Sequence, residues 1–294
     1  MNGLPEKANV SFTYEITAGL AERRRRGYIR RGTPLVGALR PDAAGKHPMQ
    51  PEARVLDIGF GTGFPLIELA QRFGADSKVY GMDVWTAGVA RARKRIEGLA
   101  LSNIEIFEQS AAAIPLPDGS IDLVTANLGI NNFADKQTVY REILRVLRPG
   151  GSLCITTNPQ DTFAEFFTLF RQTLQEHHLA DLVRRLDQSV DRRSDRPSVC
   201  REFEASGMQL TTYREDRTTL RFADAAAVFD HGLIRIGFRP EWEALIPDAH
   251  QEAVFTSLLR AIQTTIAERG EFVLSIPMLY LQFTPAPTRF ADQK

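Results

Sequence analysis

From residue 52 onward, short apolar runs alternate with longer segments in which apolar residues recur at helical spacing. Runs of the first kind predict buried strands, and segments of the second kind predict amphipathic helices. The expected strands are 54–59, 78–84, 104–110, 121–129 and 152–158. The expected helices between them are 65–74, 86–101 and 137–151.

Strands that alternate with helices in this way predict right-handed crossovers and a parallel sheet covered on both faces. The strands are continuously apolar, as burial on both faces requires. We therefore expect an α/β protein: a doubly wound, Rossmann-like, mostly parallel sheet with helical cap segments. The cap is expected because the pattern after Asn158 turns largely helical, before a last strand at 271–283.

The chain of 294 residues is interpreted as a single domain, 1–294. Within it we expect an N-terminal helical lead-in over 1–50 and a ligand-binding core over 51–159. Residues 160–294 would supply the rest of the sheet with the inserted cap. Phenylalanines recur at helical spacing from Phe163 to Phe170, which favours packing on the body of the protein over lining of a ligand cavity.

Composition excludes several classes of protein. The formal net charge is zero, so charge gives no general argument for nucleic acid or an anionic membrane. Cys154 and Cys200 form neither a disulfide framework nor a zinc cluster, and no metal site is expected. No signal peptide is visible, and no apolar run approaches the length of a membrane span. A cytoplasmic protein is the expectation.

The stretch VLDIGFGTGFP carries the chemistry that is easiest to interpret. Gly59, Gly61 and Gly63 follow the first strand, where ligands of open parallel sheets bind, and they let a ligand approach the backbone. A dinucleotide fingerprint would read G-x-G-x-x-G, but here the third glycine comes one residue early. Asp57 stands just before the loop, which disfavours a pyrophosphate and favours a cationic ligand.

The second strand adds a ribose partner. Asp83 follows the loop at about the spacing at which a carboxylate accepts both ribose hydroxyls. The pocket therefore calls for an adenosine-like ribose joined to a positively charged tail. S-adenosyl-L-methionine, which leaves as S-adenosyl-L-homocysteine, has both features.

Four motifs then carry a resemblance over about 52–158: VLDIGFGTG, VYGMDV, AAAIPLPDGSIDLVTANLGINNFAD and REILRVLRPGGSLCI. In this order they resemble class I S-adenosylmethionine-dependent methyltransferases, of the small-molecule branch that includes the ubiquinone and menaquinone C-methyltransferases. The resemblance implies a single methyltransferase domain that binds S-adenosyl-L-methionine. The implied cofactor residues are Asp57, Gly59, Phe60, Gly61 and Gly63 around the methionine part, Asp83 on the ribose, Val84 on adenine, Ser110 and Ala111 on the base edge, and the backbone of Asn127 and Leu128 on the methionine side.

One position departs from that family. An acid often follows the third strand and accepts a hydrogen bond from the adenine amino group, whereas this chain has Gln109-Ser110-Ala111. The Ser110 hydroxyl can still accept that bond, although more weakly than a charged oxygen, and Ala111 can offer its backbone N–H.

The methyl acceptor is much less visible in the sequence, because methyl transfer chiefly needs alignment of the nucleophile and exclusion of water. Asn131 and Asn132 are substrate-pocket candidates, with capping of the following turn as the equal alternative. His231 is the first candidate for a general base. A small molecule is the expected acceptor. The Phe- and Leu-rich cap segments are compatible with an apolar or aromatic one, although plain core packing is the favoured explanation of those residues. The acceptor's identity, the atom methylated and the oligomeric state stay open.

Two alternatives are kept. A nicotinamide-dependent dehydrogenase is disfavoured by the glycine spacing and Asp57. An RNA-directed methyltransferase, or a non-catalytic cofactor-binding module, would use the arginine-rich segment 22–32 as its contact. A solvated helix face is the favoured interpretation of that segment.

Overall fold

The structure is a computed structural model that describes residues 49–191, 193 and 195–287. The helical lead-in expected over 1–50 and the arginine-rich segment 22–32 therefore lie outside the described residues, except for positions 49 and 50. Within the described part, no helix combines the length and the apolar character needed to cross a membrane.

Seven strands form one sheet in the order β3-β2-β1-β4-β5-β7-β6. The strands are β1 (Arg54–Ile58), β2 (Lys78–Met82), β3 (Ile104–Phe107), β4 (Ile121–Asn127), β5 (Leu147–Thr157), β6 (Met208–Phe222) and β7 (Phe272–Pro285). The pairs β1–β2, β1–β4, β2–β3 and β4–β5 are all parallel. From β1 the sheet is extended on one side by β2 and β3 and on the other side by β4 and β5, so the strand order reverses between β1 and β4. Ligands of such folds bind at this point. The expected doubly wound α/β fold is confirmed.

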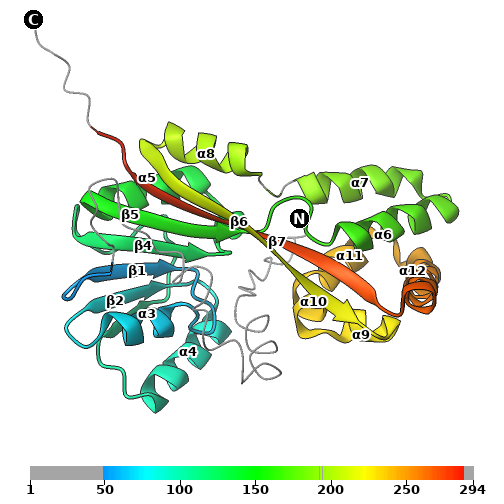
Figure 1. The fold of residues 1–294 in the computed structure, drawn as a ribbon, viewed down its shortest axis with the longest axis horizontal. Coiled ribbons are helices and arrows are strands. Elements are labelled where there is room, and N and C mark those ends of the chain that lie inside the picture. Colours follow the sequence, from blue (N-terminus) through cyan, green and yellow to red (C-terminus); the bar gives the residue numbers. More distant parts are fainter. Residues whose placement is uncertain (1–48, 192, 194, 288–294) are drawn as a thin grey trace, which may run out of the picture. The chain divides into compact units, whose positions relative to one another are not determined.

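The chain divides into two compact units. The described part of unit 1 comprises residues 49–157, 197–214 and 280–287, and unit 2 comprises 158–196 and 215–279. Unit 1 holds β1 to β5, as Figure 1 shows, with the helices α3 (Leu66–Phe73), α4 (Thr86–Gly98), the short η1 (Ile130–Asn132), α5 (Lys136–Val146) and most of α8 (Arg196–Ala205). The description of 1–294 as one domain stays a prediction.

The core of unit 1 follows from the apolar strands. Val55 and Leu56 of β1 and Leu123 of β4 are fully buried, because helices and neighbouring strands cover both faces. Phe60 and Leu66, just after β1, pack into the same core. The loop that leaves β1 is thus anchored on both sides by buried apolar side chains.

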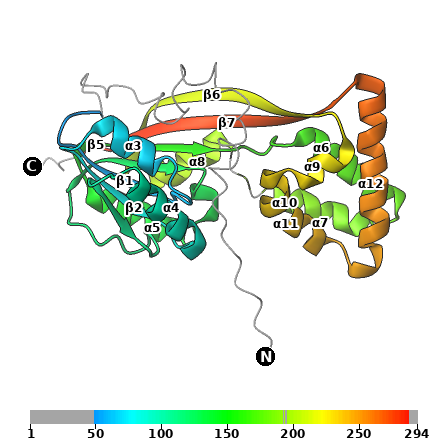
Figure 2. The same cartoon turned by 90° about the horizontal axis from the view of Figure 1, so that it is seen from below.

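Unit 2 is largely helical. Its helices are α6 (Ala164–Glu176), α7 (Ala180–Asp191), α9 (Ala225–Asp230), α10 (Gly232–Gly237), α11 (Arg239–Leu245) and α12 (Asp248–Arg269), the long helix of this unit in Figure 2. Phe166 and Phe170 of α6 are fully buried, and the Phe166 ring stacks on Trp242 with 4.1 Å between centroids. The phenylalanine spacing is therefore explained by packing within this unit, as favoured from the sequence.

Candidate functional site

The glycine loop after β1 adopts backbone angles that other residues resist. Gly59, Gly61 and Gly63 have φ values of 79°, 53° and 106°. At Gly63 a Cβ atom would also lie 2.7 Å from Cδ1 of Ile67 on α3, which is closer than carbon atoms pack. The Gly59 N–H donates to the carbonyl oxygen of Met82 at 2.7 Å, so the loop is tied to the end of β2.

Asp83 follows β2 and fixes the same loop from its side chain. Its Oδ2 accepts a 2.6 Å hydrogen bond from the Gly61 N–H, and its Oδ1 accepts one of 2.8 Å from the Trp85 N–H. Burial raises the pKa of Asp83, and these amide donors oppose the rise. Each carboxylate oxygen has a second lone pair, so both can still accept from a bound hydroxyl.

Asp57, at the end of β1, is fully buried. Its Oδ1 accepts a 2.6 Å hydrogen bond from the Thr125 hydroxyl on β4, whereas its Oδ2 has no hydrogen-bond partner among the described residues. Burial raises the pKa of Asp57 to about 7, the charge of Asp83 adds to this rise, and the Thr125 hydroxyl opposes it. The backbone N–H of Leu66 also opposes it, but less, because this N–H makes no hydrogen bond of ordinary geometry to Oδ2. A buried acceptor oxygen without a donor is costly, which suits a site completed by a donor from a ligand.

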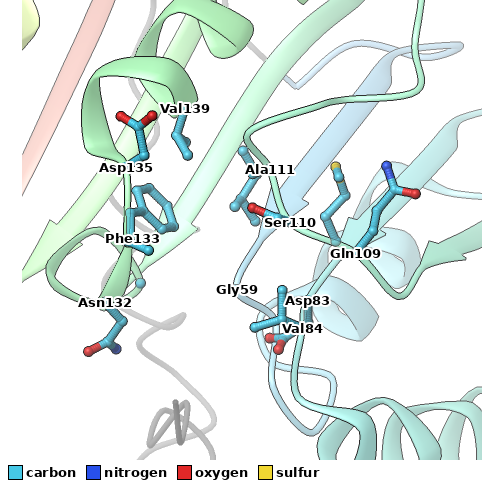
Figure 3. Close-up of a pocket in the computed structure, with 14 residues that line it drawn as sticks. Gly59, Asp83, Val84, Gln109, Ser110, Ala111, Asn132, Phe133, Asp135 and Val139 are labelled. Carbon is cyan, nitrogen blue, oxygen red and sulfur yellow. The ribbon is translucent and has the colours of Figure 1, made fainter. Parts of the chain in front are cut away.

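A cavity of about 290 Å³ opens at the carboxyl ends of these strands (Figure 3). Its volume is at the lower end of the range for small-molecule sites. The lining residues are Ile58, Gly59, Met82, Asp83, Val84, Gln109, Ser110, Ala111, Gly129, Asn132, Phe133, Ala134, Asp135 and Val139. It therefore lies where an open parallel sheet binds its ligand.

The two sides of the cavity come from different segments. In Figure 3, Phe133 and Val139 face it from one side, and Val84 and Ala111 face it from the other. Val84 is 51% exposed, an unusual exposure for a large aliphatic side chain that lines a cavity. Apolar walls on both sides suit a flat ring, and the Ser110 hydroxyl points between them.

Five of the residues proposed from the sequence to bind the cofactor line this cavity: Gly59, Asp83, Val84, Ser110 and Ala111. The other six do not line it. They are Asp57, Phe60, Gly61, Gly63, Asn127 and Leu128. Because the Phe60 side chain is fully buried in the core, only its backbone could serve a ligand. A cofactor role for all eleven residues stays a prediction.

Asn127 and Leu128, at the end of β4, are held by the neighbouring strand. The Thr156 hydroxyl of β5 donates to Asn127 Oδ1 at 2.5 Å. The Leu128 N–H donates to the Thr156 carbonyl oxygen at 3.0 Å, and Leu128 has a φ of 56°. Gly129 then lines the cavity, with its Cα close to Gly59.

The two asparagine candidates separate in the structure. The Asn131 amide donates to the Thr157 hydroxyl at 2.9 Å, and Asn131 does not line the cavity. Asn132, one residue on, does line it. Asn132 therefore keeps its place as a ligand-contacting candidate, and Asn131 ties the η1 turn to β5.

Some lining residues were not anticipated. Ile58 and Met82 close β1 and β2, so their strand-terminal positions were a usable signal. Phe133 and Val139 come from the turn after η1 and from α5, where the sequence gives no periodic pattern that points to a ligand. Asp135 is visible as an N-cap, since its Oδ1 accepts from the Thr138 N–H at 3.0 Å.

His231 belongs to unit 2 and joins α9 to α10. Its ring packs edge-on against Phe222, with 5.7 Å between centroids. It is not one of the residues that line the cavity. Its role as a general base stays a prediction.

Comparisons with known proteins identify the family of this chain. A family model described as a methyltransferase domain matches residues 50–202. The demethylmenaquinone methyltransferase of Bacillus mycoides is 33% identical over 118 residues, which are 40% of this chain and 50% of that protein. That of Listeria welshimeri is 36% identical over 111 residues, which are 37% of this chain and 47% of the relative. The chain spans about half the length of these curated relatives.

Solved structures resemble the fold. The YcgJ protein of Bacillus subtilis has a TM-score of 0.51 at 20% identity, covering 81% of this chain and 93% of the other. The cyclase SpnF has a TM-score of 0.51 at 17% identity, covering 81% and 77%. At such identities these likenesses support the fold alone.

The family match covers β1 to β5 and every residue that lines the cavity. It confirms, at the level of the family, the resemblance carried by the sequence motifs. This chain belongs to the methyltransferase-domain family.

Proposed function

We propose that this protein is an S-adenosylmethionine-dependent methyltransferase that transfers a methyl group to a small-molecule acceptor by in-line displacement. The observation that carries the proposal is the buried Asp57 Oδ2, which lacks a donor among the described residues, beside the glycine loop. A buried carboxylate in that place favours a cationic ligand over a pyrophosphate. Membership of the methyltransferase-domain family supports the same assignment.

The residues present fit the cofactor. Asp83, just after the carboxyl end of β2, offers two carboxylate oxygens to ribose hydroxyls. Val84 and Phe133 provide apolar faces for a base, and Ser110 provides a polar edge. Gly59 and Gly129 both line the cavity, and their lack of side chains lets the two backbone segments lie close together.

When bound, the cofactor supplies a methyl group that its sulfonium already activates. The protein then has to hold the cofactor, align the acceptor and keep water out. Asp57 would face the positively charged tail, and Asn132 would contact the ligand at the η1 turn. If the acceptor must lose a proton, His231 is the candidate base, and His231→Asn should then lower kcat while cofactor binding stays unchanged.

We extend the proposal to the acceptor: a small apolar or aromatic molecule. The relatives named above are demethylmenaquinone methyltransferases, so a quinone with an unmethylated ring position is the first acceptor to test. We further propose a cytoplasmic location, in line with the sparse cysteines and the neutral composition.

Titration calorimetry on the full chain tests the cofactor assignment. We expect S-adenosylhomocysteine to bind and NAD not to bind. Tight binding of NAD with no binding of S-adenosylhomocysteine would overturn the proposal. Transfer of labelled methyl from S-adenosylmethionine to a demethylated naphthoquinone then tests the acceptor, and labelling of RNA instead would move the assignment to the nucleic-acid alternative.

A further inference from the structure

The segment between β3 and β4, residues 108–120, forms one wall of the cavity but contains neither helix nor strand. Its start, Gln109 to Ala111, faces the cavity. Local bonds alone hold it weakly: the Gln109 amide donates to the Ala113 carbonyl oxygen at 2.8 Å, and Ser110 Oγ accepts from the Ala112 N–H at 3.2 Å. An irregular segment of this length needs further anchors to keep one conformation.

Arg145 of α5 supplies most of those anchors. Its guanidinium donates to the carbonyl oxygens of Ile114 and Leu116 at 2.8 and 2.9 Å, and to Asp118 Oδ1 at 2.6 Å. The Gly119 N–H donates in return to the Arg145 carbonyl oxygen at 2.9 Å. One side chain thus fixes three separate points of the segment, which requires the planar, many-donor head of arginine.

Glu142, one turn earlier on α5, completes the arrangement. Its Oε1 and Oε2 accept from Arg145 Nε and Nη2 at 2.7 and 2.8 Å, and Oε2 also accepts from the Ile114 N–H at 2.8 Å. The hydrogen bonds from Arg145 lower the pKa of Glu142. The carboxylate therefore orients the guanidinium and binds the segment itself.

The same helix also carries the opposite wall. Asp135 caps α5, Val139 lies in its first turns, and both line the cavity. Positions 135, 139 and 142 follow each other at spacings of four and three residues, which places them on one face of a helix. As Figure 3 shows, Asp135 and Val139 stand across the cavity from Ser110. One rigid helix thus contacts one side of the cavity and ties down the other.

We propose that Arg145 and Glu142 are positioning residues that set the affinity for the nucleobase half of the cofactor by fixing residues 109–120 against α5. Neither residue lines the cavity, so both act through the segment they hold. This inference rests on the proposed function. It predicts an effect on cofactor binding that ordinary loss of stability does not produce.

The test compares Arg145→Ala with a matched control, Arg148→Ala. Arg148 lies three residues further on, is about as exposed, and pairs with Asp122 of β4 at 2.5 Å. Within the described part of the chain its side chain makes no hydrogen bond to residues 109–120. We expect Arg145→Ala to weaken S-adenosylhomocysteine binding about tenfold, because the segment loses its three hydrogen bonds from the guanidinium and would have to become ordered when the ligand binds. Arg148→Ala should bind within about twofold of wild type, even if it lowers Tm as much.

Two further readouts separate positioning from folding. Amide exchange should speed up in 109–120 of Arg145→Ala while β1 and β4 stay protected. KM for S-adenosylmethionine should rise with kcat at saturation near wild type. Arg145→Lys, which keeps the charge but loses the fork, should resemble Arg145→Ala, and covers the case in which the alanine variant fails to fold.

The possible outcomes separate a failure of this inference from a failure of the proposed function. Wild-type affinity in both Arg145 variants would overturn the inference while the proposed function stands. Equal weakening in Arg145→Ala and Arg148→Ala would also overturn it, since the effect would then follow stability. A wild-type chain that binds no S-adenosylhomocysteine would instead overturn the proposed function.

Discussion

The backbone N–H of Gly61 donates a 2.6 Å hydrogen bond to Asp83 Oδ2, so the glycine loop after β1 is held by the first residue beyond β2. Asp83 therefore has two tasks in one carboxylate. It shapes the loop, and its remaining lone pairs face the cavity. The consequences of substitution are accordingly larger than the loss of one ligand contact.

We expect Asp83→Ala to weaken S-adenosylhomocysteine binding by more than about tenfold, since it removes the proposed ribose acceptors and leaves the Gly61 N–H without its carboxylate acceptor. Calorimetric Kd values measure this directly. Asp83→Asn retains the shape and one acceptor oxygen, so its loss should be smaller. An unchanged Kd in Asp83→Ala would remove Asp83 from the site.

Asp57 predicts a pH-dependent stability. Its pKa is raised from 3.8 to about 7 in the folded state. Between these two pH values, the native state therefore holds a proton that the unfolded chain has released. The neutral carboxyl favours folding below about pH 4, and this contribution is lost as pH rises towards 7. At about 1.4 kcal/mol per unit, roughly 4 kcal/mol is at stake.

The Asp57→Asn variant isolates this contribution. Wild type should lose stability between about pH 5 and pH 8 as Asp57 ionises, whereas the amide of the variant cannot ionise. The free energy of unfolding of Asp57→Asn minus that of wild type should therefore be larger at pH 8 than at pH 5. Urea unfolding at the two pH values measures the difference. Parallel pH profiles for the two proteins would show that Asp57 is not the titrating group.

Gly63→Ala should destabilise the fold by about 1–3 kcal/mol, the usual cost of overpacking. The new Cβ would lie 2.7 Å from Ile67 Cδ1, and the residue would keep a φ of 106°. Adding Ile67→Val removes the clashing methyl but not the backbone strain. Thermal unfolding of both single variants and the double variant measures this. The double variant should lose less stability than the two single variants together, but should stay less stable than Ile67→Val alone. Stability losses that simply add would contradict the contact between the new Cβ and Ile67.

Because Ser110 stands where related proteins often have an acid, we expect this protein to discriminate only weakly between adenine and other purine bases. A hydroxyl can both donate and accept, whereas a carboxylate only accepts. Wild type should bind S-adenosylhomocysteine and its inosine analogue with affinities within about tenfold of each other, and Ser110→Asp should widen the ratio by about another tenfold in favour of adenine. Competition titrations give both constants. An unchanged ratio in Ser110→Asp would place the base edge elsewhere.

Strands β1 and β4 could be predicted because burial on both faces leaves continuous apolar runs. Strand β6 has no such run, because most of its residues are exposed. Several boundaries differ, and the largest errors lie at one junction: α5 ends at Val146 and β5 begins at Leu147, whereas the sequence pattern extended the helix to Gly151 and began the strand at Ser152. Proline cannot continue a helix, and Leu147 already pairs with Ile121 before regular pairing resumes at Ser152.

The site was predictable where it depends on strand ends and glycines. The Thr125 partner of Asp57 was not, because the two residues meet only through the β1–β4 register. Phe133 was missed for a related reason: a residue in an irregular turn carries no periodic signal. Contacts that depend on strand register or on the geometry of an irregular turn could thus not be predicted from the pattern of apolar and polar residues.

Helix α5 contacts the cavity at Asp135 and Val139 and holds the opposite segment at Glu142 and Arg145. Inserting or deleting one residue between these points would rotate the second half of the helix by about 100° relative to the first. Arg145 would then point away from the segment that it holds. The length of α5 between Val139 and Glu142 is therefore constrained by both sides of the cavity.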